Sequence, residues 1–213
     1  MTTNNIKTII FDLGGVYFTP GSFLAIEKIK EIYDIENEKA LREIFSDQPN
    51  SEGNLLRRGL ITIDEFEESL FSKLGINKKE RKHTRYIWFG SYCIHYGIES
   101  LLQELKRNKY RLLIFSGNVR ERVEYLEKKC GFLKYFDDIV FSFDYHLNKD
   151  DIEFYRELIN HIECEPSEAI LIDDEKKNIK IARSMGLRAI HYYYTEKLIE
   201  DLKKYGIIVN QRV

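Results

Sequence analysis

The 213-residue sequence has few cysteines, and they are odd in number, widely spaced and free of CxxC pairs: Cys93, Cys130 and Cys164. This pattern predicts reduced thiols in a cytoplasm-like compartment and argues against a disulfide framework or a zinc site. The sequence also lacks any apolar stretch that approaches the length of a membrane span, and no basic region followed by a long apolar run opens the chain. We therefore predict a cytoplasmic protein that does not contact membranes.

A strong charge imbalance is missing as well, because 33 basic residues face 35 acidic ones and the net charge is −2. No global field would attract nucleic acid, and the basic run at 78–85 is interpreted as a solvated helix face, so nucleic acid is not an expected partner. The absence of a G-x-x-x-x-G-K-[ST] loop argues against nucleotide hydrolysis of the P-loop kind. Nothing marks a coiled coil or a large exposed apolar patch, and the sequence leaves the oligomeric state open.

Short apolar runs alternate with helical patterns, and 43% hydrophobic residues are enough for a full core. Five runs are typical of buried parallel strands: 8–11, 111–115, 139–141, 169–172 and 188–192. Helical periodicity marks four segments in the second half of the chain: 100–108, 120–130, 152–161 and 176–185. This alternation predicts an α/β fold with a doubly wound parallel sheet.

Residues 17–96 show helical patterns without convincing strands. One apolar stripe runs along 22–33, and Thr62-Ile63-Asp64-Glu65 forms a capping box that opens another helix. A helical insertion after the first strand would lie over the carboxyl edge of the sheet. We therefore expect a core formed by 1–16 and 97–213, with 17–96 as a helical lid or cap.

The candidate chemistry lies directly after predicted strands, at the carboxyl edge where open α/β sheets bind ligands. Asp12 follows the first strand, and the glycines after it allow the backbone to approach a ligand closely. A hydroxyl with free backbone N–H groups suits a phosphate oxygen, a lysine can neutralise it, and adjacent carboxylates suit Mg²⁺. These partners follow later strands: Ser116-Gly117-Asn118, Lys149 and Asp173-Asp174.

This order of elements resembles the haloacid dehalogenase-like hydrolase superfamily over nearly the whole chain. The similarity is carried by FDLGGV, by the strand ending in Ser116, by LNKDDIEFY around Lys149, and by ILIDDEKKNIKIARSMG. The FDLGGV form, the phrase RRGLITIDEFEESL and the Asp-Asp pair most resemble small sugar-phosphate phosphatases and the phosphatase domain of epoxide hydrolases. The resemblance implies a Rossmann-like core with an inserted helical cap.

The resemblance also implies a mechanism, in which Asp12 attacks phosphorus and water hydrolyses the aspartyl-phosphate. Mg²⁺ would be held by Asp12, the Gly14 carbonyl, Asp173 and Asp174. Ser116 and the amides of Gly117 and Asn118 would bind the phosphoryl oxygens, and Lys149 would balance charge. Asn178 would support the metal site, and Arg57 and Arg58 of the cap are candidates to reach a small phosphorylated substrate.

One position departs from the family pattern. Most family phosphatases carry a second aspartate two residues after the nucleophile, where this chain has Gly14. Loss of a general acid typically removes roughly 10²–10⁴ in rate, so we expect a slow phosphatase or one suited to good leaving groups. The resemblance favours sugar phosphates as its substrates. Two alternatives stay open: a catalytically silent phospho-ligand binder, and a metal-independent dehalogenase, which would not need the Asp-Asp pair.

Overall fold

The computed structural model describes residues 6–76 and 83–210. Its centre is a five-stranded parallel sheet in the order β3-β2-β1-β4-β5. The strands are β1 (Thr8–Phe11), β2 (Arg111–Ser116), β3 (Asp138–Phe141), β4 (Ala169–Asp173) and β5 (Arg188–His191). This sheet confirms the predicted α/β fold. Two strands are longer than predicted at their carboxyl ends, because Ser116 pairs with Phe141 and Asp173 with His191.

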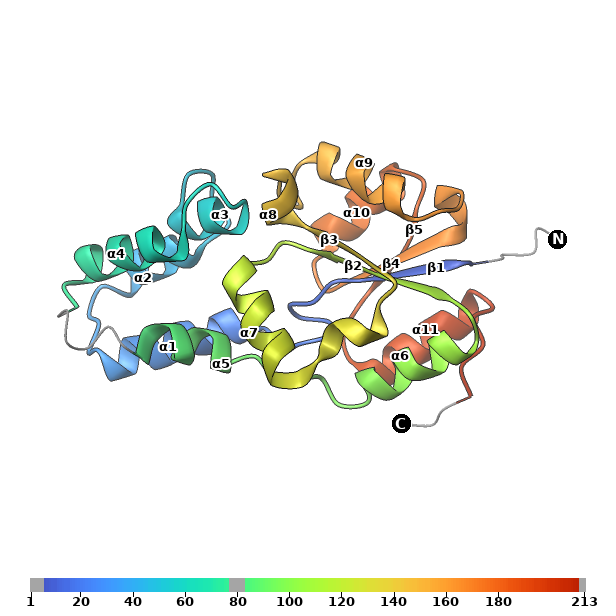
Figure 1. Cartoon of the computed structure of the whole chain (residues 1–213), viewed down its shortest axis with the longest axis horizontal. Coiled ribbons are helices and arrows are strands. Elements are labelled where there is room, and N and C mark those ends of the chain that lie inside the picture. Colours follow the sequence, from blue (N-terminus) through green and yellow to red (C-terminus); the bar gives the residue numbers. More distant parts are fainter. Residues whose placement is uncertain (1–5, 77–82, 211–213) are drawn as a thin grey trace.

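Side chains of successive strand residues alternate between the two faces of the sheet, and each face is covered by helices (Figure 1). Ile9 and Phe11 belong to a cluster that includes residues of α6 (Ile98–Arg107), α7 (Arg120–Cys130) and α11 (Thr195–Lys204). Ile10 belongs to the opposite cluster, with residues of α9 (Ile152–His161) and α10 (Lys176–Ser184). Both clusters are strongly apolar, which explains why the strands read as continuous hydrophobic runs.

Most of the predicted helices are present with shifts of one or two residues. Helix α6 begins at Ile98 rather than at residue 100, and α10 ends at Ser184. Helix α11 was not predicted, although Leu198, Ile199 and Leu202 share its buried face. Three short elements complete the core: η2 (Phe132–Tyr135), α8 (Ser142–Tyr145) and η3 (Pro166–Glu168).

Among the described residues, five α-helices lie between β1 and α6, and Figure 1 shows them to one side of the sheet. They are α1 (Gly21–Ile32), α2 (Glu38–Phe45), α3 (Glu52–Arg57), α4 (Ile63–Leu74) and α5 (Thr84–Gly90). Phe45, Phe66 and Trp88 form the centre of their packing, with ring centroids 4.9 to 5.3 Å apart. Thr62 and Glu65 make both hydrogen bonds of the predicted capping box. Positions 78–82 of the basic run lie outside the described residues.

The helical segment is tied to the sheet next to the carboxyl ends of the strands. Phe18 forms isolated β-bridges with Gly14 and Ile94. The hydroxyl of Ser142 in α8 donates to the Arg57 carbonyl at 2.5 Å and accepts from the Asn118 amide at 3.0 Å. Helices α1 to α5 are therefore anchored beside the edge where the candidate chemistry lies.

Two further predictions concern the cysteines and membrane-spanning segments. All three cysteines are free thiols, as predicted. Over the described ranges, no helix is both long and apolar enough to span a bilayer.

Candidate active site

The strand order explains why distant parts of the sequence meet. Strand β1 lies in the centre of the sheet, with β2 and β4 as its two neighbours. Phe11 is in register with Ile114 of β2 and with Ile172 of β4. Residues that follow these positions emerge at the same level of the carboxyl edge, which brings Asp12, Ser116 and Asp173 together.

Asp12 is buried and its carboxylate is fixed by three hydrogen-bond donors. Its Oδ1 accepts from the Ser116 hydroxyl at 2.8 Å and from the Leu13 amide at 2.7 Å. Its Oδ2 lies 2.8 Å from the Nζ of Lys149. A carboxylate held in this way is pre-oriented for attack along one direction, which favours a role as a nucleophile.

Lys149 is held between two carboxylates. Its Nζ donates to Asp173 Oδ2 at 2.6 Å as well as contacting Asp12. Asp173 is fully buried, and its Oδ1 accepts from the Glu175 amide at 2.8 Å and from Asn178 Nδ2 at 3.0 Å. Both oxygens of Asp173 are thus engaged, so its clearest contribution is to position Lys149. Asn178, expected to support the metal site, contacts Asp173 through this hydrogen bond.

The charges of this cluster shift one another's pKa values. Burial raises the pKa of Asp12 to about 7, although the charge of Lys149 opposes this shift and those of Asp173 and Asp174 add to it. Burial likewise raises the pKa of Asp174 to about 6, with repulsion from Asp173 adding to it. Burial alone would lower the pKa of Lys149, but Asp12 and Asp173 outweigh it and raise that pKa above its usual range. The lysine therefore stays charged, whereas the carboxylates favour a further cation.

The three aspartates offer a place for that cation. One carboxylate oxygen from each of Asp12, Asp173 and Asp174 lies within 4.8 Å of the others. Gly15 has φ +82°, and a Cβ there would lie 2.1 Å from Asp174 Oδ2, so only glycine leaves room for this carboxylate. At Gly14, by contrast, an added Cβ would meet nothing within 4 Å. Gly15 therefore makes room for Asp174, whereas no neighbouring atom requires a glycine at position 14.

The predicted phosphate cradle is only partly directed at the pocket. Of the residues expected to bind phosphate, Gly117 and Lys149 line the pocket. The backbone amide of Asn118 donates to Ser142, and its side-chain oxygen accepts from Arg122. The Ser116 hydroxyl donates to Asp12. In this arrangement, Ser116 and Asn118 support Asp12 and the pocket wall.

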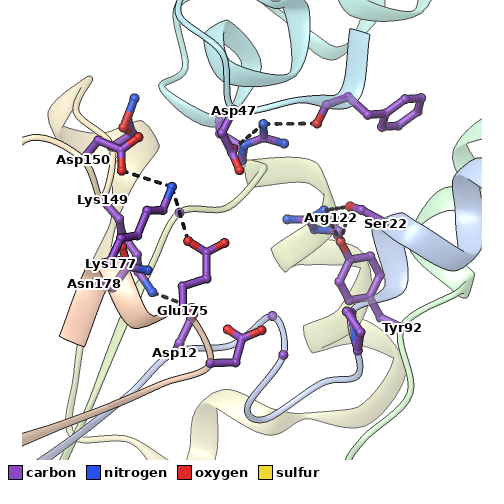
Figure 2. Close-up of a pocket in the computed structure, with 18 residues that line it drawn as sticks. Asp12, Ser22, Asp47, Tyr92, Arg122, Lys149, Asp150, Glu175, Lys177 and Asn178 are labelled. Carbon is purple, nitrogen blue, oxygen red and sulfur yellow. Dashed lines mark hydrogen bonds and ion pairs between the residues drawn. The ribbon is translucent and has the colours of Figure 1, made fainter. Parts of the chain in front are cut away.

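A pocket of about 240 Å³ opens in front of Asp12 and is lined by residues of both the sheet edge and the helical segment (Figure 2). Of the two arginines predicted to reach a substrate, only Arg57 lines it. The Nε of Arg58 donates instead to the His146 carbonyl at 2.9 Å. Adjacent residues of a helix end point in different directions, which the dipeptide pattern does not reveal.

The sequence reasoning missed several pocket residues, among them Ser22, Asp47, Tyr92 and Arg122. The first three of these come from the segment 17–96, where only helical periodicity was interpreted. Arg122 lies one helical turn after Asn118, within a helix that was predicted correctly. Its position just beyond a strand end was the one signal that could have identified it.

Comparisons with known proteins identify the family and the fold that this chain is similar to. A family model described as haloacid dehalogenase-like hydrolase matches residues 20–192. A sesquiterpene phosphatase of Aspergillus oryzae is 25% identical over 87% of this chain and 89% of its own length. A phosphorylated carbohydrates phosphatase of Thermotoga maritima is 26% identical over 87% of this chain and 84% of its own length. The structure of an HAD family enzyme of Bacteroides thetaiotaomicron, in complex with magnesium and inorganic phosphate, covers 90% of this chain and 96% of its own at 24% identity, with a TM-score of 0.76.

Proposed function

This chain belongs to the haloacid dehalogenase-like hydrolase family, and we propose that it is a Mg²⁺-dependent phosphatase of a small phosphorylated metabolite. The observation that carries the proposal is the contact of the Asp12 carboxylate with Lys149, beside Asp173 and Asp174. Phosphatases occur among its relatives, and one of them is named for phosphorylated carbohydrates. Sugar phosphates are therefore the favoured substrates, and the free thiols favour a cytoplasmic setting.

In the proposed reaction, an oxygen of Asp12 attacks phosphorus and the bond from phosphorus to the leaving oxygen breaks, and the leaving oxygen takes a proton from solvent water. The Lys149 ammonium reduces the repulsion between the carboxylate and the phosphoryl oxygens. Ser116 keeps the carboxylate oriented through its hydrogen bond to Oδ1. Water then attacks phosphorus of the aspartyl-phosphate, which releases phosphate and restores Asp12.

The donor set fits Mg²⁺, because Asp12, Asp173 and Asp174 supply hard oxygen ligands within reach of one another. Asp12 and Asp174 would hold the ion directly, with the Gly14 carbonyl as a further oxygen donor. Asp173 is fully buried and contacts Lys149 at 2.6 Å, so it would act mainly through this lysine. When bound, the ion neutralises charge that develops on the phosphoryl oxygens.

Gly14 leaves the leaving group without the usual aspartate as a proton donor. We propose that the enzyme therefore favours phosphate esters with good leaving groups. An Asp at this position has room, since a Cβ at Gly14 meets nothing within 4 Å. The substitution G14D should raise kcat for alkyl phosphates while changing kcat for p-nitrophenyl phosphate little.

Residues 17–96 are proposed to act as a cap that selects the substrate. Supporting this, Ser22, Phe45, Asp47, Arg57 and Tyr92 all line the pocket in front of Asp12. The volume of about 240 Å³ is below the roughly 300–1,000 Å³ that is usual for small-molecule pockets. This favours a compact substrate.

The proposal is tested by a screen of phosphorylated metabolites, in which phosphate release is measured with Mg²⁺ and with EDTA. We expect turnover with Mg²⁺ that is lost with EDTA and in the Asp12→Asn variant. Equal background release under all three conditions would contradict the proposal.

A catalytically silent phospho-ligand binder is the second candidate, and the glycine at position 14 is the observation that favours it. Such a protein would bind phosphate esters equally well as wild type and as D12N, without turnover. A dehalogenase would instead release halide without Mg²⁺, and the cluster of three aspartates argues against it.

A further inference from the structure

Arg122 is a buried cation on the pocket wall, and it is not part of the cluster around Asp12. Its side chain is 4% exposed and extends from α7 toward the pocket. Figure 2 shows Arg122 grouped with Ser22 and Tyr92 on the side of the pocket opposite Lys149. The wall thus combines a core helix with the helical segment 17–96.

The partners of Arg122 are neutral. Its Nε donates to Asn118 Oδ1 at 2.8 Å, and its Nη1 donates to the Tyr92 hydroxyl at 2.5 Å. The guanidinium also lies over the rings of Tyr92 and Trp88, at 4.6 and 5.5 Å from their centroids. Within residues 6–76 and 83–210, no carboxylate forms an ion pair with it.

A buried charge without a counter-charge is costly, and in proteins such groups are normally paired. Burial lowers the pKa of Arg122; Tyr92 opposes this shift, the charge of Arg57 adds to it, and the charge of Asp12 opposes it weakly. Arg57 itself is matched by Asp47 at 2.6 Å, but the side chain of Asp47 is 59% exposed. This part of the wall therefore presents more positive than negative charge to the pocket.

The surrounding contacts hold the guanidinium in place. The hydroxyls of Ser22 and Tyr92 lie 2.6 Å apart, and Trp88 Nε1 donates to Ser22 at 3.1 Å. A Cβ at Gly21 would lie 2.5 Å from the Tyr92 ring, so a small residue there permits this packing. An orienting network around an unpaired cation is the arrangement expected for recognition of an anion.

We propose that Arg122, assisted by Arg57, forms a second anion subsite, and that the substrate carries a carboxylate or second phosphoryl group besides the phosphoryl group facing Asp12. This inference rests on the proposed function of the same pocket. It narrows the substrate class to phosphorylated acids and bisphosphates. Lys149 cannot serve this second group, because its ammonium is already shared by Asp12 and Asp173.

Two matched pairs of compounds test the subsite on the wild-type protein. The first pair is 3-phosphoglycerate and glycerol 3-phosphate, which differ in a carboxylate. The second is propane-1,3-diol bisphosphate and its monophosphate, which differ in a phosphoryl group. In one pair, we expect kcat/KM to be at least about 10-fold higher for the compound that carries a second anionic group. The pair that shows this preference tells whether the subsite binds a carboxylate or a phosphoryl group.

Variants test whether Arg122 is responsible for the preference in kcat/KM. Arg122→Met should reduce the ratio within the preferred pair by about 10- to 100-fold, to near one, and Arg57→Gln should reduce it less. Arg120→Gln removes an exposed arginine of the same helix and should leave the ratio unchanged. A wild-type ratio near one in both pairs would overturn the proposal, and so would an unchanged ratio in a folded R122M. If R122M does not fold, the wild-type kcat/KM ratios and their decrease in R57Q still test the subsite.

Binding separates this inference from the proposed function. Dissociation constants of both pairs are measured by calorimetry on Asp12→Asn, which retains the pocket. Tighter binding of the compound with two anionic groups, without turnover by the wild-type protein, would support the subsite and contradict the proposed phosphatase activity. Turnover without such a preference would contradict the subsite alone.

Discussion

The sheet edge and the facing wall of the pocket handle their charges in different ways. At the sheet edge, Lys149 contacts Asp12 at 2.8 Å and Asp173 at 2.6 Å, and the three aspartates leave an excess of negative charge that a further cation would balance. On the wall, Arg122 donates hydrogen bonds to neutral groups and packs against aromatic rings, and no carboxylate of the described residues forms an ion pair with it. The proposed nucleophile thus has a cation in contact with it, whereas the proposed subsite gains a counter-charge only from a bound anion.

The comparison assigns different tasks to the two regions. The contacts of Asp12 with Lys149 and Ser116 hold its carboxylate in place in the absence of a ligand, which is what a nucleophile requires. An unmatched cation gains most of its stabilisation from the ligand and therefore selects among ligands. We therefore propose that the residues at the sheet edge carry the chemistry and that the facing wall selects the substrate.

The largest effect should follow from Lys149→Met, which breaks the sheet-edge cluster. Asp12 and Asp173 would be left buried without their cation, so kcat/KM should fall by about 10³-fold or more and the free energy of unfolding by about 3–5 kcal/mol. Phosphate release and denaturant titration measure the two quantities. Lys177→Met removes a half-exposed pocket lysine and should change kcat/KM less than about 10-fold. A Lys149→Met enzyme with more than a tenth of wild-type activity would contradict the assignment.

The next effect separates the two adjacent glycines. Gly15→Ala should displace Asp174 and strain the backbone at φ +82°, which lowers the free energy of unfolding by about 1–3 kcal/mol and weakens Mg²⁺ binding about 10- to 100-fold. Gly14→Ala should change stability by no more than about 0.5 kcal/mol. Titration of activity with Mg²⁺ compares the two variants, and equal effects would show that Asp174 does not depend on Gly15.

A smaller effect concerns pH. The pKa of Asp12 is about 7 and that of Asp174 about 6, both above the usual 3.8 of an unfolded aspartate. Between about pH 4 and pH 7, the folded state therefore holds protons that the unfolded chain has released, and this contribution to stability is lost as pH rises. Activity needs ionised Asp12, so kcat/KM should fall about 10-fold per pH unit below about pH 7 at low Mg²⁺.

Higher Mg²⁺ concentration should move this acid limb to lower pH, because the cation stabilises the ionised carboxylates. The measurement is kcat/KM against pH at two Mg²⁺ concentrations. A limb at the same pH in both series would mean that the carboxylates do not hold the ion.

The smallest effect is expected in the helical segment, away from the pocket. Thr62→Ala removes the capping box at the start of α4 and should cost about 1 kcal/mol of stability. Thr62→Ser keeps the cap and serves as the control. Because Thr62 does not line the pocket, kcat/KM should change less than about 2-fold, and a larger loss would show that the stability of α4 is coupled to the site.

The sequence by itself determined the α/β class and the edge at which chemistry is placed. Apolar runs such as Ile9–Phe11 and 169–172 are recognisable because both faces of the strands are buried. Asp12, Ser116 and Asp174 could be predicted as neighbours because the carboxyl ends of parallel strands meet at one edge. The capping box of α4 at Thr62 could also be predicted, because it involves residues only three apart.

Only the tertiary structure decided how the neighbouring residues divide their tasks. It showed that Asp173 orients Lys149 while Asp174 packs against Gly15, although the two acids are adjacent in the sequence. It also directed Arg57 to the pocket and Arg58 to His146, and it brought Arg122 together with Tyr92. These outcomes depend on helix packing between segments far apart in the chain, and that packing leaves no periodic or short-range pattern in the sequence.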